Sequence, residues 1–172
     1  MRILTVSLMA VVVCVPALRA QQAGGSIDVP TGTGVVLQAK GDGVQIYTCT
    51  ASPGGTKWAL TAPDAMLLDS DGKMVGWHFA GPTWRLEDGG LVQGELVASK
   101  ASPQAGSVAW LLLRAKAGTA KGTLAGVAFV RRTETHGGVA PGSGCAGSQD
   151  AGKTVRVPYT ATYTFYSDST KR

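Results

Sequence analysis

Apolar and polar residues alternate along most of the chain, which is the pattern of half-buried β-strands. Val44 and Ile46 fall on one face of such a strand, and Gln45 and Tyr47 fall on the other. The clearest strand is the last, where aromatic residues and alanine alternate with threonine over residues 159–165. Since Gly or Pro interrupts the chain at short intervals, the sequence leaves no room for a long helix.

Two tight turns predict two β-hairpins. Asp71-Gly72 and Asp88-Gly89 each lie between apolar runs, and glycine accepts the positive φ that such turns require. The strands on either side of these turns are predicted at residues 65–69, 74–79, 83–87 and 91–99.

Further strands are predicted towards the C-terminus. Residues 108–115 are almost continuously apolar, which indicates a central strand, with a short buried helix as the alternative. Residues 124–133 form the next strand, and the Gly-rich segment Glu134–Lys153 is too long for a tight turn. With roughly eight to ten short strands, the sequence predicts an all-β single domain, either an antiparallel β-sandwich or a barrel, with one long Gly-rich loop.

Residues 1–20 are predicted to be a secretory signal peptide. Arg2 precedes an apolar run that ends at Pro16, and this run is short for a membrane span. A transmembrane anchor and a lipoprotein acylated at Cys14 are the alternatives. After the signal we expect a flexible lead-in at 21–34, a β domain at 35–166 and a frayed tail at 167–172. The predicted location is therefore periplasmic or extracellular, with no transmembrane segment after cleavage.

Removing the signal leaves two cysteines, Cys49 and Cys145. An exported protein with two cysteines is expected to form one disulfide, and two separate buried thiols are the alternative.

Charge narrows the range of partners. The formal net charge is +5, and the basic residues are scattered, with Arg131-Arg132 as the internal pair. We therefore expect no nucleic-acid partner and no polybasic attachment to a membrane surface. The mature protein is expected to be a monomer that binds a small molecule or a glycan.

The stretch from Trp77 to Trp84 holds the most distinctive side chains. Its best catalytic candidate is His78, because histidine titrates near neutral pH. A ligand-binding site is predicted at Trp77, His78, Trp84 and Arg85, since aromatic faces beside polar groups suit flat ligands. Strand alternation sets His78 on the face opposite Trp77. In the alternative interpretation, His78 bonds a loop carbonyl and these rings only pack a corner.

Few catalytic arrangements fit this chain. A G-x-S-x-G nucleophile elbow is missing, and Cys and His are not clustered at zinc-binding spacing. A metal site at His78, His136 and Glu134 would need the long loop to fold over the Trp77–Trp84 stretch. A carboxylate pair could come from Glu87, Asp88 or Glu95, although acidic residues are also common at turns. No cofactor is predicted, because G-x-G-x-x-G between a strand and a helix is absent.

Several segments together resemble a family of secreted bacterial and fungal proteins catalogued as a domain of unknown function. The shared features include the H-x-A-G-P-T-W motif of residues 78–84 and the residues around both cysteines. The other matching segments are 43–49, Trp58, 62–65, 68–72, 110–112, 137–141 and 157–163. The resemblance implies export, one β-rich domain and the Cys49–Cys145 pair, and it implies no established reaction. His136 lies outside the motif.

The sequence thus predicts an exported, non-catalytic envelope or extracellular binding protein. The alternatives are a small hydrolase or metal-dependent enzyme centred on His78, and a purely structural wall-associated protein.

Overall fold

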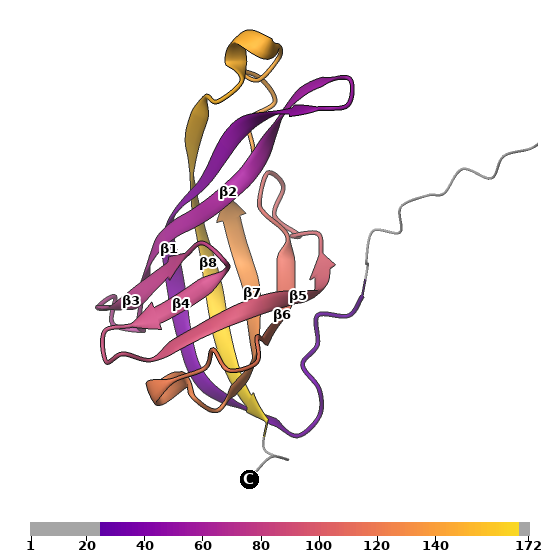
Figure 1. Ribbon diagram of the computed structural model, residues 1–172. Helices are drawn as coiled ribbons and strands as arrows, with labels where there is room; N and C mark the ends of the chain where they lie inside the picture. The colour runs from indigo at the N-terminus through magenta and orange to yellow at the C-terminus, as the bar shows by residue number, and fades with distance from the viewer. Residues whose placement is uncertain (1–24, 169–172) are drawn as a thin grey trace, which may run out of the picture.

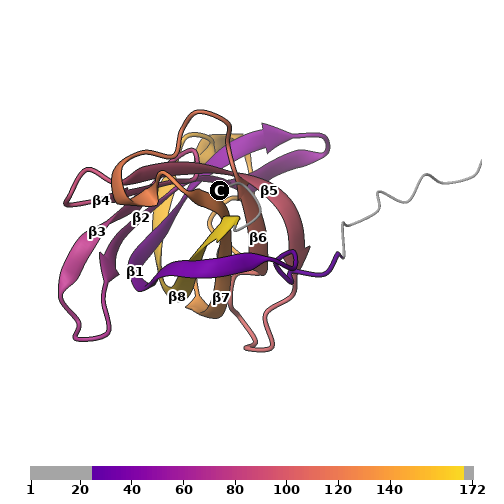
Figure 2. The ribbon, with the colours of Figure 1, turned by 90° about the horizontal axis from the view of Figure 1, so that it is seen from below.

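The computed structural model describes residues 25–168, so the predicted signal peptide and the last residues of the tail lie outside it. Eight antiparallel strands follow one another around a closed barrel (Figures 1 and 2). They are β1 (Thr33–Ser52), β2 (Gly55–Leu68), β3 (Met74–Phe79), β4 (Thr83–Leu86), β5 (Leu91–Lys100), β6 (Trp110–Ala115), β7 (Val127–Gly137) and β8 (Thr154–Asp168). The all-β prediction is confirmed, the barrel is the one of the two predicted architectures that is observed, and residues 110–115 form a strand rather than a helix.

Alternation decides which side chains enter the barrel. On β1, Gln45, Tyr47 and Cys49 are buried, while the residues between them are partly exposed. On β8, every second side chain from Tyr159 to Phe165 is buried, and Thr164 on the opposite face is buried as well. Both patterns agree with the alternation in the sequence, because successive side chains of a strand point to opposite faces.

Glycines make room for the large rings inside the barrel. A Cβ atom at Gly41 would lie 2.5 Å from the ring of Tyr163, and one at Gly94 would lie 3.1 Å from Trp84. In the orientation of Figure 1, the lower half of the barrel is consequently filled by aromatic and aliphatic side chains. Leu124 of the short 3-10 helix η1 (Gly122–Leu124) is fully buried in this core.

Three strands continue above the barrel. β2 pairs with β3 only from Ala65 to Leu68, whereas its pairing with β1 continues to Gly55. β8 pairs with β1 as far as Thr154, and its pairing with β7 ends at Tyr159. We call the part of β1, β2 and β8 beyond these points the upper extension; it forms the narrow top of the molecule in Figure 1.

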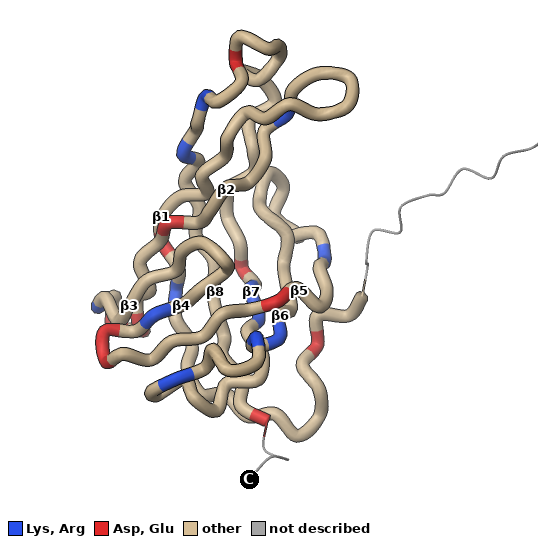
Figure 3. Tube along the Cα trace, in the orientation of Figure 1, with Lys and Arg blue, Asp and Glu red and all other residues tan. Residues whose placement is uncertain are grey.

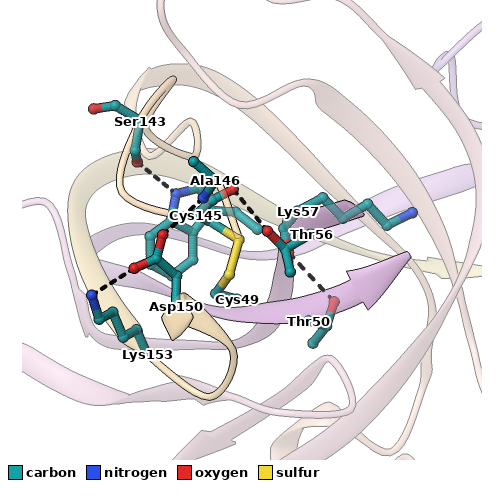
Figure 4. Close-up of a disulfide and its surroundings, with 10 residues drawn as sticks. Cys49, Thr50, Thr56, Lys57, Ser143, Cys145, Ala146, Asp150 and Lys153 are labelled. Atoms are coloured by element: carbon teal, nitrogen blue, oxygen red, sulfur yellow. Dashed lines mark hydrogen bonds and ion pairs between the residues drawn. A yellow bond between two sulfur atoms is a disulfide. The ribbon is translucent and has the colours of Figure 1, made fainter. Parts of the chain in front are cut away.

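The long Gly-rich loop is fastened to the upper extension. β7 runs through Gly137, so this loop occupies residues 138–153, a shorter span than the sequence predicts, and contains the 3-10 helix η2 (Ser148–Asp150). The disulfide between Cys49 and Cys145 joins it to β1, as predicted. Trp58 Nε1 also donates to the Ser143 carbonyl at 2.9 Å, and Thr56 Oγ1 donates to the Cys145 carbonyl at 3.1 Å (Figure 4).

Residues 25–32 precede the first strand and lie against the outside of the barrel. Ile27 is only 8% exposed and packs with Ala98 and Leu112. This part of the predicted lead-in therefore has an apolar anchor. Within residues 25–168, no helix has the length and apolar character needed to cross a membrane.

Candidate functional site

A cavity of about 240 Å³ opens where β2 leaves β3 and enters the upper extension. One wall is the β2 segment Leu60–Pro63, and another is the β3–β4 turn at Gly81-Pro82. The remaining lining residues come from six strands and are Gln45, His78, Trp84, Leu111, Leu113, Arg132 and Tyr163. The cavity thus lies directly above the filled lower half of the barrel.

Stacked rings form one side of the cavity. His78 of β3 and Trp84 of β4 are directly opposite each other, and their rings stack with centroids 4.6 Å apart and planes 9° apart. The edge of this pair meets Tyr163, whose ring centroid lies 4.9 Å from that of His78 and 5.6 Å from that of Trp84. Such contacts hold the rings in fixed positions, so this surface is ordered without a ligand.

His78 is neutral at physiological pH. His78 is only 3% exposed, and its Nδ1 lies 3.0 Å from the Thr83 carbonyl oxygen. Since a carbonyl only accepts, Nδ1 carries the proton and Nε2 is an acceptor. The pKa of His78 is lowered to about 3, mainly by burial; the hydrogen bond to Thr83 opposes this shift, and the Arg132 charge adds to it.

The surroundings of His78 offer little for acid–base or metal chemistry. Neither a carboxylate nor a second histidine is among the residues that line the cavity. His136 lies with Glu134 and Trp110 in a different pocket. Within residues 25–168, no group of three or more His, Cys, Asp or Glu side chains could hold a metal ion. An imidazole with a pKa of about 3 is also a poor base at neutral pH.

Arg132 places a positive charge at the wall of the cavity. Its Nε and Nη2 donate to the Ala109 carbonyl at 3.1 and 2.8 Å. Burial raises the pKa of both Tyr159 and Tyr163, and the Arg132 charge partly opposes this rise. The two tyrosines are therefore neutral, and their hydroxyl groups bond each other at 3.1 Å.

Two buried N–H groups at the cavity lack a protein partner. Gln45 Nε2 and Trp84 Nε1 are both inaccessible to solvent and form no hydrogen bond within residues 25–168. Both residues contribute to the cavity lining. A buried donor left unpaired costs about 1–3 kcal/mol, so the fold tolerates two unfavourable groups at the same place.

The four residues predicted to bind a ligand lie on opposite faces of the sheet. His78 and Trp84 line the cavity, whereas Trp77 and Arg85 pair across β3 and β4 on the outer face. The Arg85 guanidinium lies 5.1 Å from the Trp77 ring centroid and 6.0 Å from that of Phe79. This cation–π contact occupies the flat surface of Trp77. The structure therefore does not bring the four residues into one site.

Sequence reasoning missed Gln45, Arg132 and Tyr163 as cavity residues. The available signal was the face that each occupies, because Gln45 shares the inward face of its strand with Tyr47 and Cys49. A polar residue at an inward position is more informative than an exposed one. Arg132 was harder to recognise as a cavity residue than Gln45, because lysines and arginines are spread over both the barrel and the upper extension (Figure 3).

Comparison with known proteins gives a family but no activity. No curated protein and no solved structure matches the chain. The model of the family described as "Protein of unknown function (DUF3455)" matches residues 30–167, a span that begins just before β1 and ends within β8. The predicted membership of a domain-of-unknown-function family is thereby confirmed. The chain belongs to the DUF3455 family of proteins of unknown function.

Proposed function

We propose that this protein is a non-catalytic binding protein that holds one small molecule in the cavity beside His78 and Trp84. The observation that carries this proposal is the combination of an apolar cavity with buried N–H groups that have no protein partner. Ligand pockets in general combine apolar walls with a few placed polar groups. Because both donors are closed to solvent, an acceptor on the ligand would pair with them once the Gln45 or Trp84 side chain shifts on binding.

The barrel supports this function by its size. An eight-stranded barrel has an interior that side chains can fill or that can hold one small ligand. Here the lower half is filled by rings such as Trp84 and Phe165, and the cavity beside His78 lies above them. The stacking of His78 on Trp84 fixes this wall before binding, which reduces the entropy that a ligand must lose.

The proposed place of action is outside the cytoplasm. The disulfide between Cys49 and Cys145 supports this location, because such bonds persist in oxidising compartments. The signal peptide predicted for residues 1–20 has the same implication. We further propose that the mature protein acts as a monomer.

Binding can be tested by NMR, because the four tryptophan indoles report on different places. Trp84 lines the cavity, Trp77 lies on the outer face, and Trp58 bonds the long loop. In a screen of small aromatic and aliphatic compounds, we expect hits to shift the Trp84 indole signal while those of Trp77 and Trp58 stay in place. Trp→Phe variants assign the signals.

Two matched substitutions on β2 locate the binding. Ala62→Phe adds a ring at the cavity wall, whereas Ala59→Phe adds the same ring three residues away at a position outside the lining. We expect Ala62→Phe to abolish the Trp84 shifts and Ala59→Phe to retain them. If hits shift Trp77 instead, or if Ala62→Phe leaves binding intact, the cavity is not the site.

A further inference from the structure

The charges around the cavity restrict its ligand further. Of the lining residues, Arg132 alone carries a full charge at neutral pH, because His78 is neutral and Asp, Glu and Lys are absent from the lining. Within residues 25–168, ion pairs join Lys40 to Asp42, Lys153 to Asp150 and Arg156 to Asp64. Arg132 is not among them. Among residues 25–168, the acceptors that Arg132 contacts are neutral, namely the Ala109 carbonyl and the Tyr163 hydroxyl.

A partly buried cation without a counter-ion is unfavourable. Arg132 is incompletely exposed, and its charge acts on His78 and on the buried Tyr159 and Tyr163. The guanidinium has five N–H donors, of which the Ala109 carbonyl engages two. The fold therefore presents an unneutralised planar cation at the cavity, and an anion bound there would gain a charge-assisted hydrogen bond.

The neighbours of Arg132 define the rest of the ligand. Leu111, Arg132 and Tyr163 face one another directly across β6, β7 and β8. Leu60 on the opposite rim is 55% exposed, although it is apolar, and Pro63 and Pro82 extend the same surface. The ligand thus needs a charged end beside Arg132 and an apolar body against these side chains.

We infer that the cavity binds a small monocarboxylic acid with an apolar body, and that Arg132 pairs with its carboxylate. One cation calls for one negative charge, and a guanidinium matches a planar carboxylate in a two-point contact. A cavity of about 150 Å³ can hold benzene, so 240 Å³ leaves room for a carboxylate on such a ring. The inference rests on the proposed function and names the chemistry of its ligand.

Three probes of one shape test the inference: benzoate, neutral benzamide and the cation benzylammonium. Each is titrated into the protein at low and high salt, with the Trp84 indole signal as the readout. We expect benzoate to bind at least about tenfold more tightly than benzamide, because a hydrogen bond to a charged group is worth about 1.5–3 kcal/mol. Benzylammonium should not bind, and salt should weaken benzoate alone.

Neighbouring arginines on β7 supply the matched control. Arg132→Gln removes the charge from the lining, while Arg131→Gln removes one that lies over the Tyr166 ring and outside the cavity. We expect Arg132→Gln to abolish the preference for benzoate over benzamide and Arg131→Gln to retain it. Thermal unfolding and the Trp84 signal establish that both variants fold.

The outcomes separate this inference from the proposed function. If benzamide binds as tightly as benzoate and Ala62→Phe blocks both, the cavity binds ligands but the carboxylate inference is wrong. The same conclusion follows if Arg132→Gln keeps the preference. If none of the three probes shifts Trp84 at millimolar concentration while a neutral compound from the screen does, the inference again fails alone. If no compound of any charge shifts Trp84, both proposals fail.

Discussion

The lower and upper halves of the barrel are built from the same strands, but their interiors carry different kinds of side chain. Beside and below Trp84, the interior holds Phe165, Leu67, Val92 and Val130, each almost completely inaccessible to solvent. Beside and above Trp84, inward positions of these strands carry the His78 imidazole and amide, guanidinium and phenol groups, and a cavity remains between them. Apolar packing stabilises the lower half, whereas the upper half retains unpaired polar groups that do not favour folding. The apolar core and the proposed binding cavity are thus separated along the barrel axis.

The first and largest test of this contrast removes a ring from the lower half. Phe165→Ala leaves a void beneath Trp84, whose ring centroid lies 5.9 Å from that of Phe165, and we expect a loss of about 3–5 kcal/mol in unfolding free energy. Leu60→Ala at the exposed cavity rim should change stability by less than about 0.5 kcal/mol. Chemical denaturation measures both. Equal losses would mean that the two halves do not differ.

The second test removes the disulfide that fastens the long loop to the upper extension. Its cysteines are 96 residues apart, and a closed loop of this length restricts the unfolded chain strongly. The double substitution Cys49→Ala and Cys145→Ala should lower the free energy of unfolding by about 2–4 kcal/mol. Reducing agent should destabilise the wild type similarly and leave the double variant unchanged. An unchanged midpoint for the double variant would contradict this.

The third test uses the two histidines and pH. His78 has a pKa of about 3 in the folded state and an ordinary value of 6.5 in the unfolded state. Between these values the unfolded chain binds more protons, so stability falls as pH falls through this window. From pH 6.5 to 4.5 the loss should reach about 2–3 kcal/mol. His78→Gln should flatten this slope, and His136→Gln, at an exposed residue, should keep it. Identical slopes in all three proteins would disprove the assignment.

The fourth and smallest test replaces an unpaired polar group in the upper half. Gln45→Met keeps the length of the side chain and removes the Nε2 donor that has no partner. We expect the free energy of unfolding to rise by about 1 kcal/mol, since the cost of the unpaired donor disappears. A loss of stability would show that the amide is satisfied in solution. Thermal unfolding without ligand gives the answer.

Several features were predictable because they depend on local chemistry. The Asp-Gly pairs at 71–72 and 88–89 placed two hairpins correctly, with Gly72 and Gly89 at positive φ. Alternation also assigned Gln45 and Tyr47 to one face. The choice between sandwich and barrel was not predictable, because alternation identifies the inward face of each strand but not which strands pair by hydrogen bonds. Closure depends on pairing between β1 and β8, far apart in the sequence.

The site was predictable only in part. Trp77, His78, Trp84 and Arg85 were grouped because they are close in sequence, yet adjacent residues of a strand face opposite ways. Arg132 was missed although it shares the inward face of β7 with Val130, because a charged side chain is not expected at an inward position. The cavity also depends on β2 leaving β3 beyond Ala65, which no local pattern indicates.

The pairing of β1 with β8 also sets the order in which the molecule can assemble. The register joins Thr33 to Asp168 at one end and Thr48 to Thr154 at the other. We call this β1–β8 pairing, which joins the first and last described strands, the seam of the barrel. Hairpins such as β3–β4 can form while the chain is still emerging, but the seam needs nearly the whole sequence. Such non-local contacts slow folding, because a long loop must close first. Since Gln45 and Tyr163 lie on the two strands of the seam, the cavity is completed only in this last step.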